Sequence, residues 1–584
     1  MKKFSRDRNA LMLLALMKAH GVRKVIASPG TTNLAFIGSM QHDPWFEMYS
    51  CVDERSAAYM ACGLAAESGE PVAIICTGAT ASRNYLPGLT EAHYRKLPVL
   101  VIAGSHGEEK IGHLHSQVID RTTPPKDTVV YSAFIQPADN RKTAWLNNVE
   151  INKALIKLRQ HGGGPVLINI VASPSADLFT AGEIPRARKI EWHVLPGELP
   201  QMPQGRVAVF VGSHVQMPQA TQQAIDDFCA SRNAVVFCDH SSGYQGKYRV
   251  NFTLVTSQVL FGTKLTDLDL LIHIGEVSGD TYTTGKLTPK AVWRVSPDGE
   301  IRDLFKKLRH VFEMDETSFF LHYTADARQD DSYLDACLKL YDDIYSKMPD
   351  FGSSNIRMAR ILSRRMPKGC VIHFGIYNSL RTWNLFRLDP SIQTSCNVGG
   401  FGIDGACSTL IGAALANPGR LHYLVVGDLA FFYDLNSLAN RHVGNNIRIL
   451  LLNNGRGIEF RHKAHPAFLF GNEADFYIAA GGHNGRQSPD LVRHFAGDLG
   501  FEYMTASNPS DLETVAERFL DPAIGTRPML WEVFTTAEDE IADMDNVRHI
   551  MASTQPLSVK AKSALDKELK KIAKVGKDWV TGVL

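Results

Sequence analysis

The stretch that decides the fold spans residues 427–454, opens with Gly427-Asp428-Leu429-Ala430 and closes with Asn453-Asn454. A hydrophobic run leads into each of its two polar ends, and a helical pattern lies between them. Asp428 and Asn454 are about 26 residues apart, close to the roughly 30 residues of a strand–helix–strand crossover. Such a crossover in a parallel sheet places the carboxyl ends of both strands at one edge. We therefore expect Asp428 and Asn454 to lie near each other.

These two polar strand ends favour a metal site. A carboxylate oxygen of Asp428, an amide oxygen of Asn454 and the backbone carbonyl of Arg456 can share one Mg²⁺, which prefers oxygen ligands and usually also takes phosphate oxygens. An ordinary crossover with polar strand ends explains the stretch equally well. The residues alone leave both interpretations open.

Composition favours a soluble, multidomain intracellular protein. The 584 residues are enough for three or four domains, and 44% of them are hydrophobic. The formal charge of +1 provides no field for nucleic acid or an anionic membrane. Nine cysteines without a CxxC pair fit a reducing cytosol, and the apolar segment at 11–17 is too short to span a bilayer. We expect a cytoplasmic protein that binds neither nucleic acid nor membrane.

The order of the predicted elements defines the fold class. Strand and helix patterns alternate through most of the chain, which predicts an α/β fold of three doubly wound parallel-sheet domains. A proline-rich stretch separates the first domain from the second, and a lysine-rich stretch with helical spacing ends the chain. The predicted boundaries are 1–185 for the first domain, 186–205 for a linker, 206–345 for the central domain, 346–550 for the third domain and 551–584 for a helical tail.

Two segments of the first domain are candidates for chemistry. Glu54 follows a hydrophobic strand and opens a helix rich in small residues, so its carboxylate is partly desolvated and suited to hold a proton. A helix N-terminal acid that faces the macrodipole is the simpler explanation. The turn 76–84 is rich in glycine and hydroxyl groups, and it can bind an anion or cap the next helix.

Two loops complete the candidates. His113, His115 and Gln117 share one short polar loop and can line a pocket, although any single histidine there is more commonly structural. The loop Gly400-Phe401-Gly402-Ile403-Asp404-Gly405 literally matches a dinucleotide-binding fingerprint. We reject that interpretation because no hydrophobic strand leads into it. A glycine-rich loop before a small-residue helix instead permits close approach of a ligand ring to the backbone.

Taken together and in order, these motifs resemble the thiamine diphosphate-dependent 2-oxo acid decarboxylase and synthase superfamily. The resemblance covers nearly the whole chain in the family's order of pyrimidine-binding, central and diphosphate-binding domains. Within that superfamily the chain is most similar to the menaquinone-pathway synthase, which adds a succinyl semialdehyde unit to isochorismate. The motifs that carry the resemblance are Glu54, the segment 164–169, Asn378-Ser379-Leu380, Phe401-Gly402-Ile403-Asp404-Gly405 and the stretch 427–454.

The resemblance implies a role for each matching residue. Glu54 would hydrogen-bond the pyrimidine ring and promote loss of the thiazolium C2 proton, and Ile403 would wedge between the two rings. Mg²⁺ would be held by Asp428, Asn454 and the Arg456 carbonyl. Gln117, with His113 and His115, would lie near the reacting carbon. Further cofactor contacts are implied at Thr77, Asn84, Asn378, Ser379, Phe401, Gly402, Gly427, Leu429, Ala430, Gly457 and Ile458.

The departures from the family concern the substrate. Thr31-Thr32, Val398 and the segment 104–106 stand where the menaquinone enzyme carries arginines or their neighbours, and neutral side chains do not replace charge-assisted bonds to a carboxylate. Arg381, Arg83 or Arg456 can compensate from other positions. The expected substrate-side residues are Thr31, Thr32, Arg381 and Val398.

These features together predict a Mg²⁺- and thiamine diphosphate-dependent enzyme. It would decarboxylate a 2-oxo acid and transfer the acyl-anion equivalent to an acceptor, with substrates that differ from those of the menaquinone enzyme. The alternatives are true menaquinone-pathway synthase activity on 2-oxoglutarate and isochorismate, simple 2-oxo acid decarboxylation, and a cofactor-binding pseudo-enzyme. The family implies a homodimer or a dimer of dimers, with active sites at the subunit interface.

Overall fold

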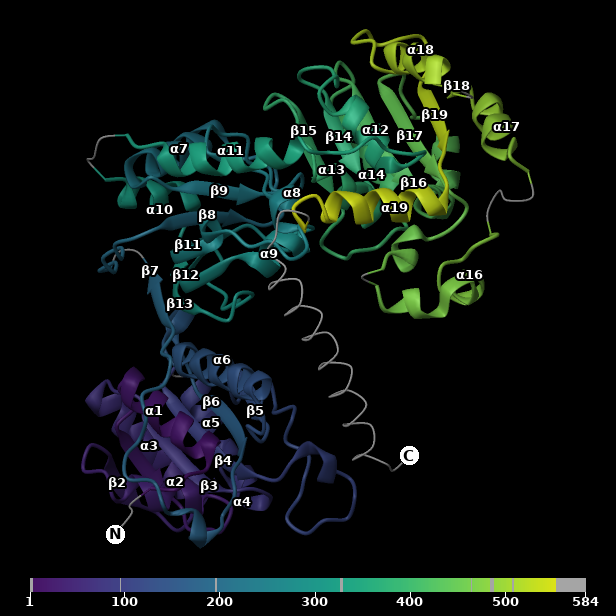
Figure 1. Ribbon diagram of the computed structural model, residues 1–584. Coiled ribbons are helices and arrows are strands. Elements are labelled where there is room, and N and C mark those ends of the chain that lie inside the picture. Colours follow the sequence, from purple (N-terminus) through teal and green to yellow (C-terminus); the bar gives the residue numbers. More distant parts are fainter. Residues whose placement is uncertain are drawn as a thin grey trace. The chain divides into compact units, whose positions relative to one another are not determined.

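The computed structural model divides the chain into two compact units (Figure 1). Unit 1 contains residues 1–199 and 298–313, and unit 2 contains 200–297 and 314–584. The structure describes residues 4–552 except 95, 195–196, 326–328, 464, 484–487 and 507–508. Most of the predicted C-terminal tail therefore lies outside the described residues.

Unit 1 is built on a six-stranded parallel sheet in the order β2-β1-β3-β4-β6-β5. Its strands are β1 (Lys24–Ala27), β2 (Glu47–Ser50), β3 (Val72–Thr77), β4 (Val99–Ser105), β5 (Tyr131–Ile135) and β6 (Val166–Val171). Its α-helices are α1 (Arg8–His20), α2 (Leu34–Met40), α3 (Glu54–Ser68), α4 (Thr80–Asn84), α5 (Leu86–Tyr94) and α6 (Arg141–Lys157).

This sheet is covered on both faces. Successive side chains of a strand point to opposite faces, so alternate residues of the central strands belong to two separate cores. Ile75 and Ile102 pack with residues of α1, α2 and α6, whereas Ile74 and Val101 pack with residues of α3 and α5. The near-continuous hydrophobic strands thus fit a parallel sheet buried on both sides.

Unit 1 also contains the parallel strands β7 (Glu191–Val194) and β13 (Leu308–Glu313), which pair with each other. β7 lies in the proline-rich stretch predicted as a linker, and its partner strand comes more than a hundred residues later in the chain. The stretch is therefore partly ordered by pairing, which local composition does not reveal.

Unit 2 begins with five parallel strands in the order β10-β9-β8-β11-β12. They are β8 (Val207–Val211), β9 (Val235–Cys238), β10 (Arg249–Val250), β11 (Asp267–Ile274) and β12 (Thr288–Val295). The helices are α7 (Gln219–Arg232), α8 (Thr253–Thr256), α9 (Thr281–Lys286), α10 (Glu316–Tyr323) and α11 (Ser332–Tyr345).

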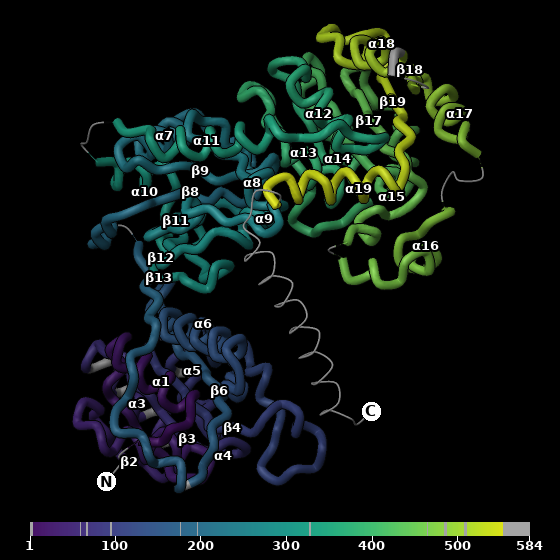
Figure 2. The backbone as a smooth tube through the Cα atoms, viewed as in Figure 1, coloured from purple at the N-terminus to yellow at the C-terminus, as the bar shows by residue number. Residues whose placement is uncertain are grey.

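The rest of unit 2 forms a six-stranded parallel sheet in the order β15-β14-β16-β17-β19-β18. The strands are β14 (Val371–Phe374), β15 (Gln393–Cys396), β16 (His422–Gly427), β17 (Ile447–Asn453), β18 (Glu502–Thr505) and β19 (Met529–Phe534). The α-helices are α12 (Asn355–Leu362), α13 (Asn378–Trp383), α14 (Ala406–Ala416), α15 (Asp428–Tyr433), α16 (Ala474–Tyr477), α17 (Leu491–Asp498), α18 (Pro509–Phe519) and α19 (Ala537–Arg548). α19, yellow in Figure 2, packs against α12.

The 427–454 stretch forms the predicted crossover. β16 and β17 are parallel neighbours with Gly427 opposite Leu452, so the residues that follow both strands emerge at the same edge. The connecting helix is shorter than predicted, because α15 ends at Tyr433 and a 3₁₀ turn, Leu435–Ala439, follows it. At the break, the Asp434 carboxylate accepts hydrogen bonds from the backbone N–H and the hydroxyl of Ser408, both at 2.6 Å.

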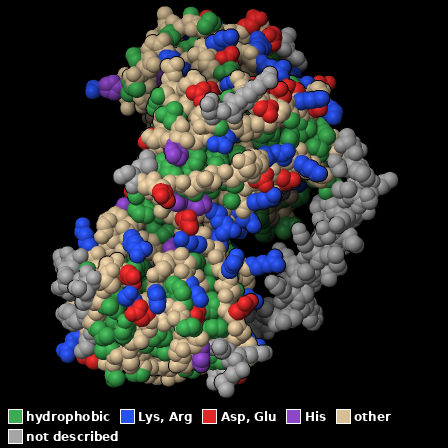
Figure 3. Space-filling model, turned by 90° about the vertical axis from the view of Figure 1, so that its left-hand side faces the viewer, with side chains coloured by type: hydrophobic (Ala, Val, Ile, Leu, Met, Phe, Trp, Pro, Cys, Tyr) green, Lys and Arg blue, Asp and Glu red, His purple; other side chains and the backbone are tan. Residues whose placement is uncertain are grey.

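The predicted α/β class with parallel sheets is confirmed, and the boundaries of the three domains stay a prediction. Among the described residues, no helix has both the length and the apolar character needed to cross a membrane. Acidic and basic side chains are interspersed on the face seen in Figure 3, in keeping with the formal charge of +1.

Candidate active site

The predicted site residues fall in both units of the chain. In unit 2, a cavity of about 270 Å³ lies at the carboxyl ends of the strands, next to α13 and α15. This edge is where ligands bind in open parallel sheets. The predicted cofactor and metal residues that line the cavity are Asn378, Ser379, Ile403, Gly427, Asp428, Leu429, Ala430, Asn454, Arg456, Gly457 and Ile458.

Asp428 is a buried carboxylate at the end of β16, with 4% of its surface exposed. Its Oδ1 accepts the Leu429 N–H at 2.9 Å and its Oδ2 accepts the Gly455 N–H at 2.6 Å. Burial raises the pKa of Asp428 to about 6, and the backbone N–H groups oppose that shift. Within the described residues this carboxylate has no ion pair with a basic side chain. A buried anion of this kind fits a divalent cation that prefers oxygen ligands.

Asn454 directly follows β17 and is half-buried beside the same cavity. Its Oδ1 accepts the Arg456 N–H at 3.3 Å, which turns the chain sharply after the strand. Gly455 takes a positive φ of 74° within this turn, a conformation that glycine adopts without strain. The structure thus brings all three predicted metal ligands to one cavity wall.

Other parts of the lining of this cavity are apolar. Ile403 packs on the core beneath α14 and presents a β-branched side chain to the cavity. A Cβ at Gly457 would lie 3.0 Å from the Phe460 ring and 3.2 Å from Leu429, so a larger residue there would require these side chains to shift. Phe401 and Gly402 precede Ile403 but do not line this cavity. The arrangement suits a ligand with one polar and one apolar end.

Glu540 on α19 supports the turn at the start of α13. Its Oε1 accepts the Asn355 N–H at 3.0 Å and its Oε2 accepts the Asn378 amide at 3.5 Å. The side chain is fully enclosed, and burial raises the pKa of Glu540 to about 7. Glu540 therefore acts on the cavity through Asn378.

Several of the predicted site loops contain a non-glycine residue with positive φ. Tyr377, immediately before α13, has φ of 65°, and Phe401 has φ of 53°. In unit 1, Ala79 has φ of 56° and Gln117 has φ of 58°. Each such non-glycine residue costs about 1–3 kcal/mol, and such costs persist chiefly where function requires the geometry.

The unit 1 part of the site contains Glu54, which is half-buried in the first turn of α3 and follows the cap residue Asp53. The Asn84 amide donates to Glu54 Oε2 at 3.5 Å. Thr77 ends β3, and its Oγ1 lies 2.5 Å from Thr32 Oγ1. The predicted residues Glu54 and Asn84 are thus in contact, as are Thr32 and Thr77.

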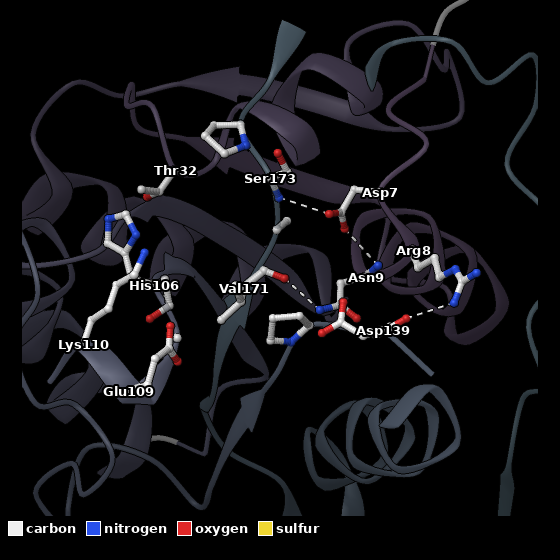
Figure 4. A pocket seen from close by; sticks show the side chains of 16 residues that line it. Asp7, Arg8, Asn9, Thr32, His106, Glu109, Lys110, Asp139, Val171 and Ser173 are labelled. Atoms are coloured by element: carbon white, nitrogen blue, oxygen red, sulfur yellow. Dashed lines mark hydrogen bonds between the residues drawn. The ribbon is translucent and has the colours of Figure 1, made fainter. Parts of the chain in front are cut away.

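A larger cavity in unit 1, of about 590 Å³, adjoins this region. Figure 4 shows Thr32, His106 and Lys110 on one side of it, and Asp7 and Arg8 on the other. Thr31 is exposed and does not line this cavity. The lining combines the carboxylates of Asp7, Glu109 and Asp139 with the basic side chains of Arg8 and Lys110, so it suits a polar ligand but has no single charge.

The predicted loop residues His113, His115 and Gln117 are all exposed. They line neither of the two cavities described above. Val398 is buried and likewise lies outside the unit 2 cavity. Their predicted roles near the reacting carbon and the substrate stay predictions.

The three arginines that could replace the missing substrate-binding arginines each contact another group of the protein. Arg381 forms an ion pair with Glu459. Arg456 Nη1 donates to Asp475 Oδ2 at 2.7 Å, and Arg83 Nη2 donates to the carbonyl of Asp120 at 2.7 Å.

Arg121 is a candidate that sequence reasoning missed. Only 8% of its surface is exposed; its Nε donates to Asn169 Oδ1 at 3.1 Å and its Nη2 to Ser105 Oγ at 2.6 Å. Its Nη1 has no hydrogen-bond partner among the described residues. A Cβ on Gly78 would lie 2.4 Å from that nitrogen. Burial lowers the pKa of Arg121.

Ser105, which accepts a hydrogen bond from Arg121, lines the large unit 1 cavity, whereas Arg121 itself lines a smaller cavity of about 30 Å³. An enclosed cation of this kind needs an anionic partner to offset its desolvation. No local motif signals this position, because Ser105 and Asn169 come from two different strands.

Comparison with known proteins identifies the class. Residues 8–123 match the family model described as thiamine pyrophosphate enzyme, N-terminal TPP binding domain. The resemblance predicted from the sequence is thereby confirmed, and the chain is an enzyme of the thiamine diphosphate-dependent type.

Three curated relatives of the chain share one enzyme name. The 2-succinyl-5-enolpyruvyl-6-hydroxy-3-cyclohexene-1-carboxylate synthase of Phocaeicola vulgatus is 29% identical over 566 residues, which cover 92% of this chain and 97% of that protein. Synthases of the same name from Bacteroides fragilis and Flavobacterium johnsoniae are 29% and 26% identical. Those alignments cover 94% and 91% of this chain and 99% and 97% of the relatives.

Proposed function

We propose that the protein is a Mg²⁺- and thiamine diphosphate-dependent synthase that decarboxylates a 2-oxo acid and transfers the remaining acyl unit to an acceptor. The pair of substrates that the relatives favour is 2-oxoglutarate and isochorismate, which give the product in the relatives' name. The observation that carries the proposal is the buried Asp428 carboxylate, without a basic partner among the described residues, in a cavity that Asn454 and Ile403 also line.

The residues of the unit 2 cavity fit the cofactor and its metal ion. Asp428, Asn454 and the Arg456 carbonyl would hold Mg²⁺, and Asn378 and Ser379 would contact the diphosphate. Bound thiamine diphosphate supplies the stabilisation of negative charge at carbon that the decarboxylation needs. The protein supplies orientation, exclusion of water and proton transfer.

Glu54 would hold a proton opposite the pyrimidine ring. Its position in the first turn of α3 and its contact with Asn84 keep the carboxylate oriented. A carboxylate positioned in this way contributes to proton transfer by geometry, since general acid–base catalysis depends first on hydrogen-bond reach.

Arg121 would bind a carboxylate of the substrate. This assignment removes the main objection to the menaquinone-pathway substrates, which was the neutral character of Thr31, Thr32 and Val398. A guanidinium with an unused N–H forms strong charge-assisted bonds to a carboxylate. The substrate would reach it from the cavity lined by Ser105 and Thr32.

A second candidate is the same chemistry on a different 2-oxo acid and acceptor. The observation that favours it is the buried, neutral Val398 where the menaquinone enzyme is expected to carry an arginine. Simple decarboxylation with release of an aldehyde is the remaining enzymatic alternative, and the loop with His113 and His115 is its only support.

We further infer a homodimer, or a dimer of such dimers, with active sites that use both subunits. Large apolar side chains are exposed next to the unit 2 cavity, on the segment that follows Phe460: Phe468, Leu469, Phe470, Phe476 and Tyr477. Several large exposed apolar side chains on one short segment are consistent with a protein contact. A second copy of the chain would cover it and bring its own Glu54 to the diphosphate side.

The experiment uses the full chain with Mg²⁺ and thiamine diphosphate. A panel of 2-oxo acids is tested with and without isochorismate, and CO₂ release and the mass of the product are measured. Turnover of 2-oxoglutarate only with isochorismate supports the first candidate, and turnover of other acids or release of an aldehyde supports the alternatives. Absence of CO₂ release from every acid, with cofactor shown to bind, contradicts all three.

A further inference from the structure

The parallel pair β7 and β13 gathers three metal-binding side chains on one face. In the register of this pair Glu191 lies opposite His310, and His193 lies opposite Phe312. Glu191 and His193 are two residues apart on a strand, so their side chains point to the same side. His310 is directly across from Glu191 and joins them. The strand pairing therefore forces a carboxylate and two imidazoles together.

The ligand atoms of these residues face one another. His193 Nε2 lies 2.9 Å from His310 Nδ1 and 3.9 Å from Glu191 Oε2, and His310 Nδ1 lies 3.5 Å from the same oxygen. All three atoms lie within 4.8 Å of one another. Atoms at these separations can all sit at the roughly 2.0–2.2 Å bond length of zinc to nitrogen and oxygen from one ion.

The surroundings hold the three side chains in place. The His193 ring stacks on Phe312 with centroids 5.1 Å apart, which restrains the orientation of the imidazole. Lys189 Nζ donates to Glu191 Oε1 at 3.1 Å, so the other carboxylate oxygen, Oε2, is the one that faces the imidazoles.

The imidazoles are also in the state that a metal requires. Their side chains are only 15% and 19% exposed for His193 and His310. Burial lowers the pKa of both rings, to about 4 for His310. The neutral imidazole is the form of histidine that binds a metal ion.

We propose that Glu191, His193 and His310 form a binding site for a borderline transition-metal ion of the zinc type, separate from the Mg²⁺ site of the cofactor. Two nitrogens and one carboxylate oxygen suit Zn²⁺, Co²⁺ or Ni²⁺, whereas Mg²⁺ prefers oxygen ligands alone. With three protein ligands, a water molecule takes the fourth position. Glu191 and His193 also line a cavity of about 340 Å³, which gives the ion a route of entry.

The ion would fasten β7 to β13. The two strands are separated by more than a hundred residues of sequence, and their pairing involves only four residues of β7. A metal that binds only the folded arrangement stabilises that arrangement by mass action. The site would thus make the order of this strand pair dependent on metal.

The test measures metal in the full-length protein with saturating thiamine diphosphate and Mg²⁺, so that the cofactor's metal site is occupied. After dialysis against Zn²⁺, we expect one zinc per chain by elemental analysis, and Co²⁺ is expected to give the visible absorption of a tetrahedral site. His193→Gln and His310→Gln should each weaken zinc binding at least about tenfold. Exposed His322→Gln is the matched control and should bind as the wild type does.

Two further measurements keep the outcome clear. Asp428→Ala should retain the zinc, because this substitution changes only the proposed Mg²⁺ site of the cofactor. Circular dichroism checks that the histidine variants fold. If either does not, zinc binding is measured in Glu191→Gln instead, together with the rise in Tm of the wild-type protein on adding Zn²⁺. Wild-type protein without bound zinc would overturn the proposal. Equal zinc binding by the wild type and the site variants would also overturn it and show that other histidines bind the metal.

Discussion

Replacement of Arg121 by glutamine separates a substrate-binding role from a structural one. The guanidinium is 8% exposed, with two of its nitrogens bonded to Asn169 and Ser105 and Nη1 without a partner among the described residues. Glutamine retains a donor that can reach part of this network. It removes the positive charge that a substrate carboxylate would contact.

The expected loss of activity follows from the bond removed. A hydrogen bond to a charged group contributes about 1.5–3 kcal/mol, and each 1.36 kcal/mol is a tenfold change in rate. We therefore expect kcat/KM for the 2-oxo acid to fall roughly 10- to 150-fold. Arg121→Lys keeps the charge and should lose less, and Ser105→Ala removes one partner of the guanidinium and should change kcat/KM by only a few-fold.

The thermal stability of Arg121→Gln should not fall with its activity. A buried cation without a counter-charge costs desolvation free energy, and replacing such a group by a neutral one is often neutral or stabilising. The Tm of substrate-free Arg121→Gln should therefore equal or exceed that of the wild type. Steady-state kinetics with a series of 2-oxo acids, together with thermal unfolding, checks both signs. Unchanged kcat/KM, or a loss of activity that only parallels a loss of stability, would refute the assignment.

Three further predictions concern Glu54, Asp428 and Glu540. Glu54→Gln should keep the fold and thiamine diphosphate affinity but lower kcat by orders of magnitude, and near-normal turnover would remove Glu54 from the proton path. Asp428→Ala should weaken Mg²⁺ and thiamine diphosphate binding together in calorimetric titrations, whereas unchanged cofactor affinity would contradict the metal assignment. Because the folded protein raises the pKa of Glu540 to about 7, its neutral form favours folding below about pH 4.5. That stability is lost as the pH rises through about 7, by roughly 3 kcal/mol at 1.36 kcal/mol per pKa unit. Glu540→Gln should flatten this part of the stability profile in denaturant titrations, and a profile identical to that of the wild type would show that Glu540 does not titrate there.

The parts of the fold that the sequence predicted are those that local spacing determines. A crossover between adjacent parallel strands takes a nearly fixed number of residues, so the spacing of Asp428 and Asn454 was enough to place both at one sheet edge. The two hydrophobic strands that lead into Asp428 and Asn454 were predicted because strands buried on both faces form continuous apolar runs.

The parts that were missed depend on pairings between distant residues. Arg121 lies against Asn169 and Ser105, and Arg381 pairs with Glu459 across 78 positions. Sequence spacing carries no signal for such contacts, so Arg381 was considered available for substrate and Arg121 was overlooked.

The strands that were missed have the same cause. β7 is ordered by pairing with β13, although prolines surround it. β15 is an edge strand of half-buried, largely polar residues beside β14. Because its residues are polar, the sequence before the glycine-rich loop was not recognised as a strand.

The central claim is that this cofactor site joins a 2-oxo acid to a second substrate. The most direct measurement is stopped-time mass spectrometry of the full-length protein with Mg²⁺, thiamine diphosphate, 2-oxoglutarate and isochorismate. It is carried out beside Asp428→Ala as the inactive control. We predict release of CO₂ together with the mass of 2-succinyl-5-enolpyruvyl-6-hydroxy-3-cyclohexene-1-carboxylate, and neither with the variant. CO₂ release that is indifferent to isochorismate and leaves only an aldehyde would contradict the claim.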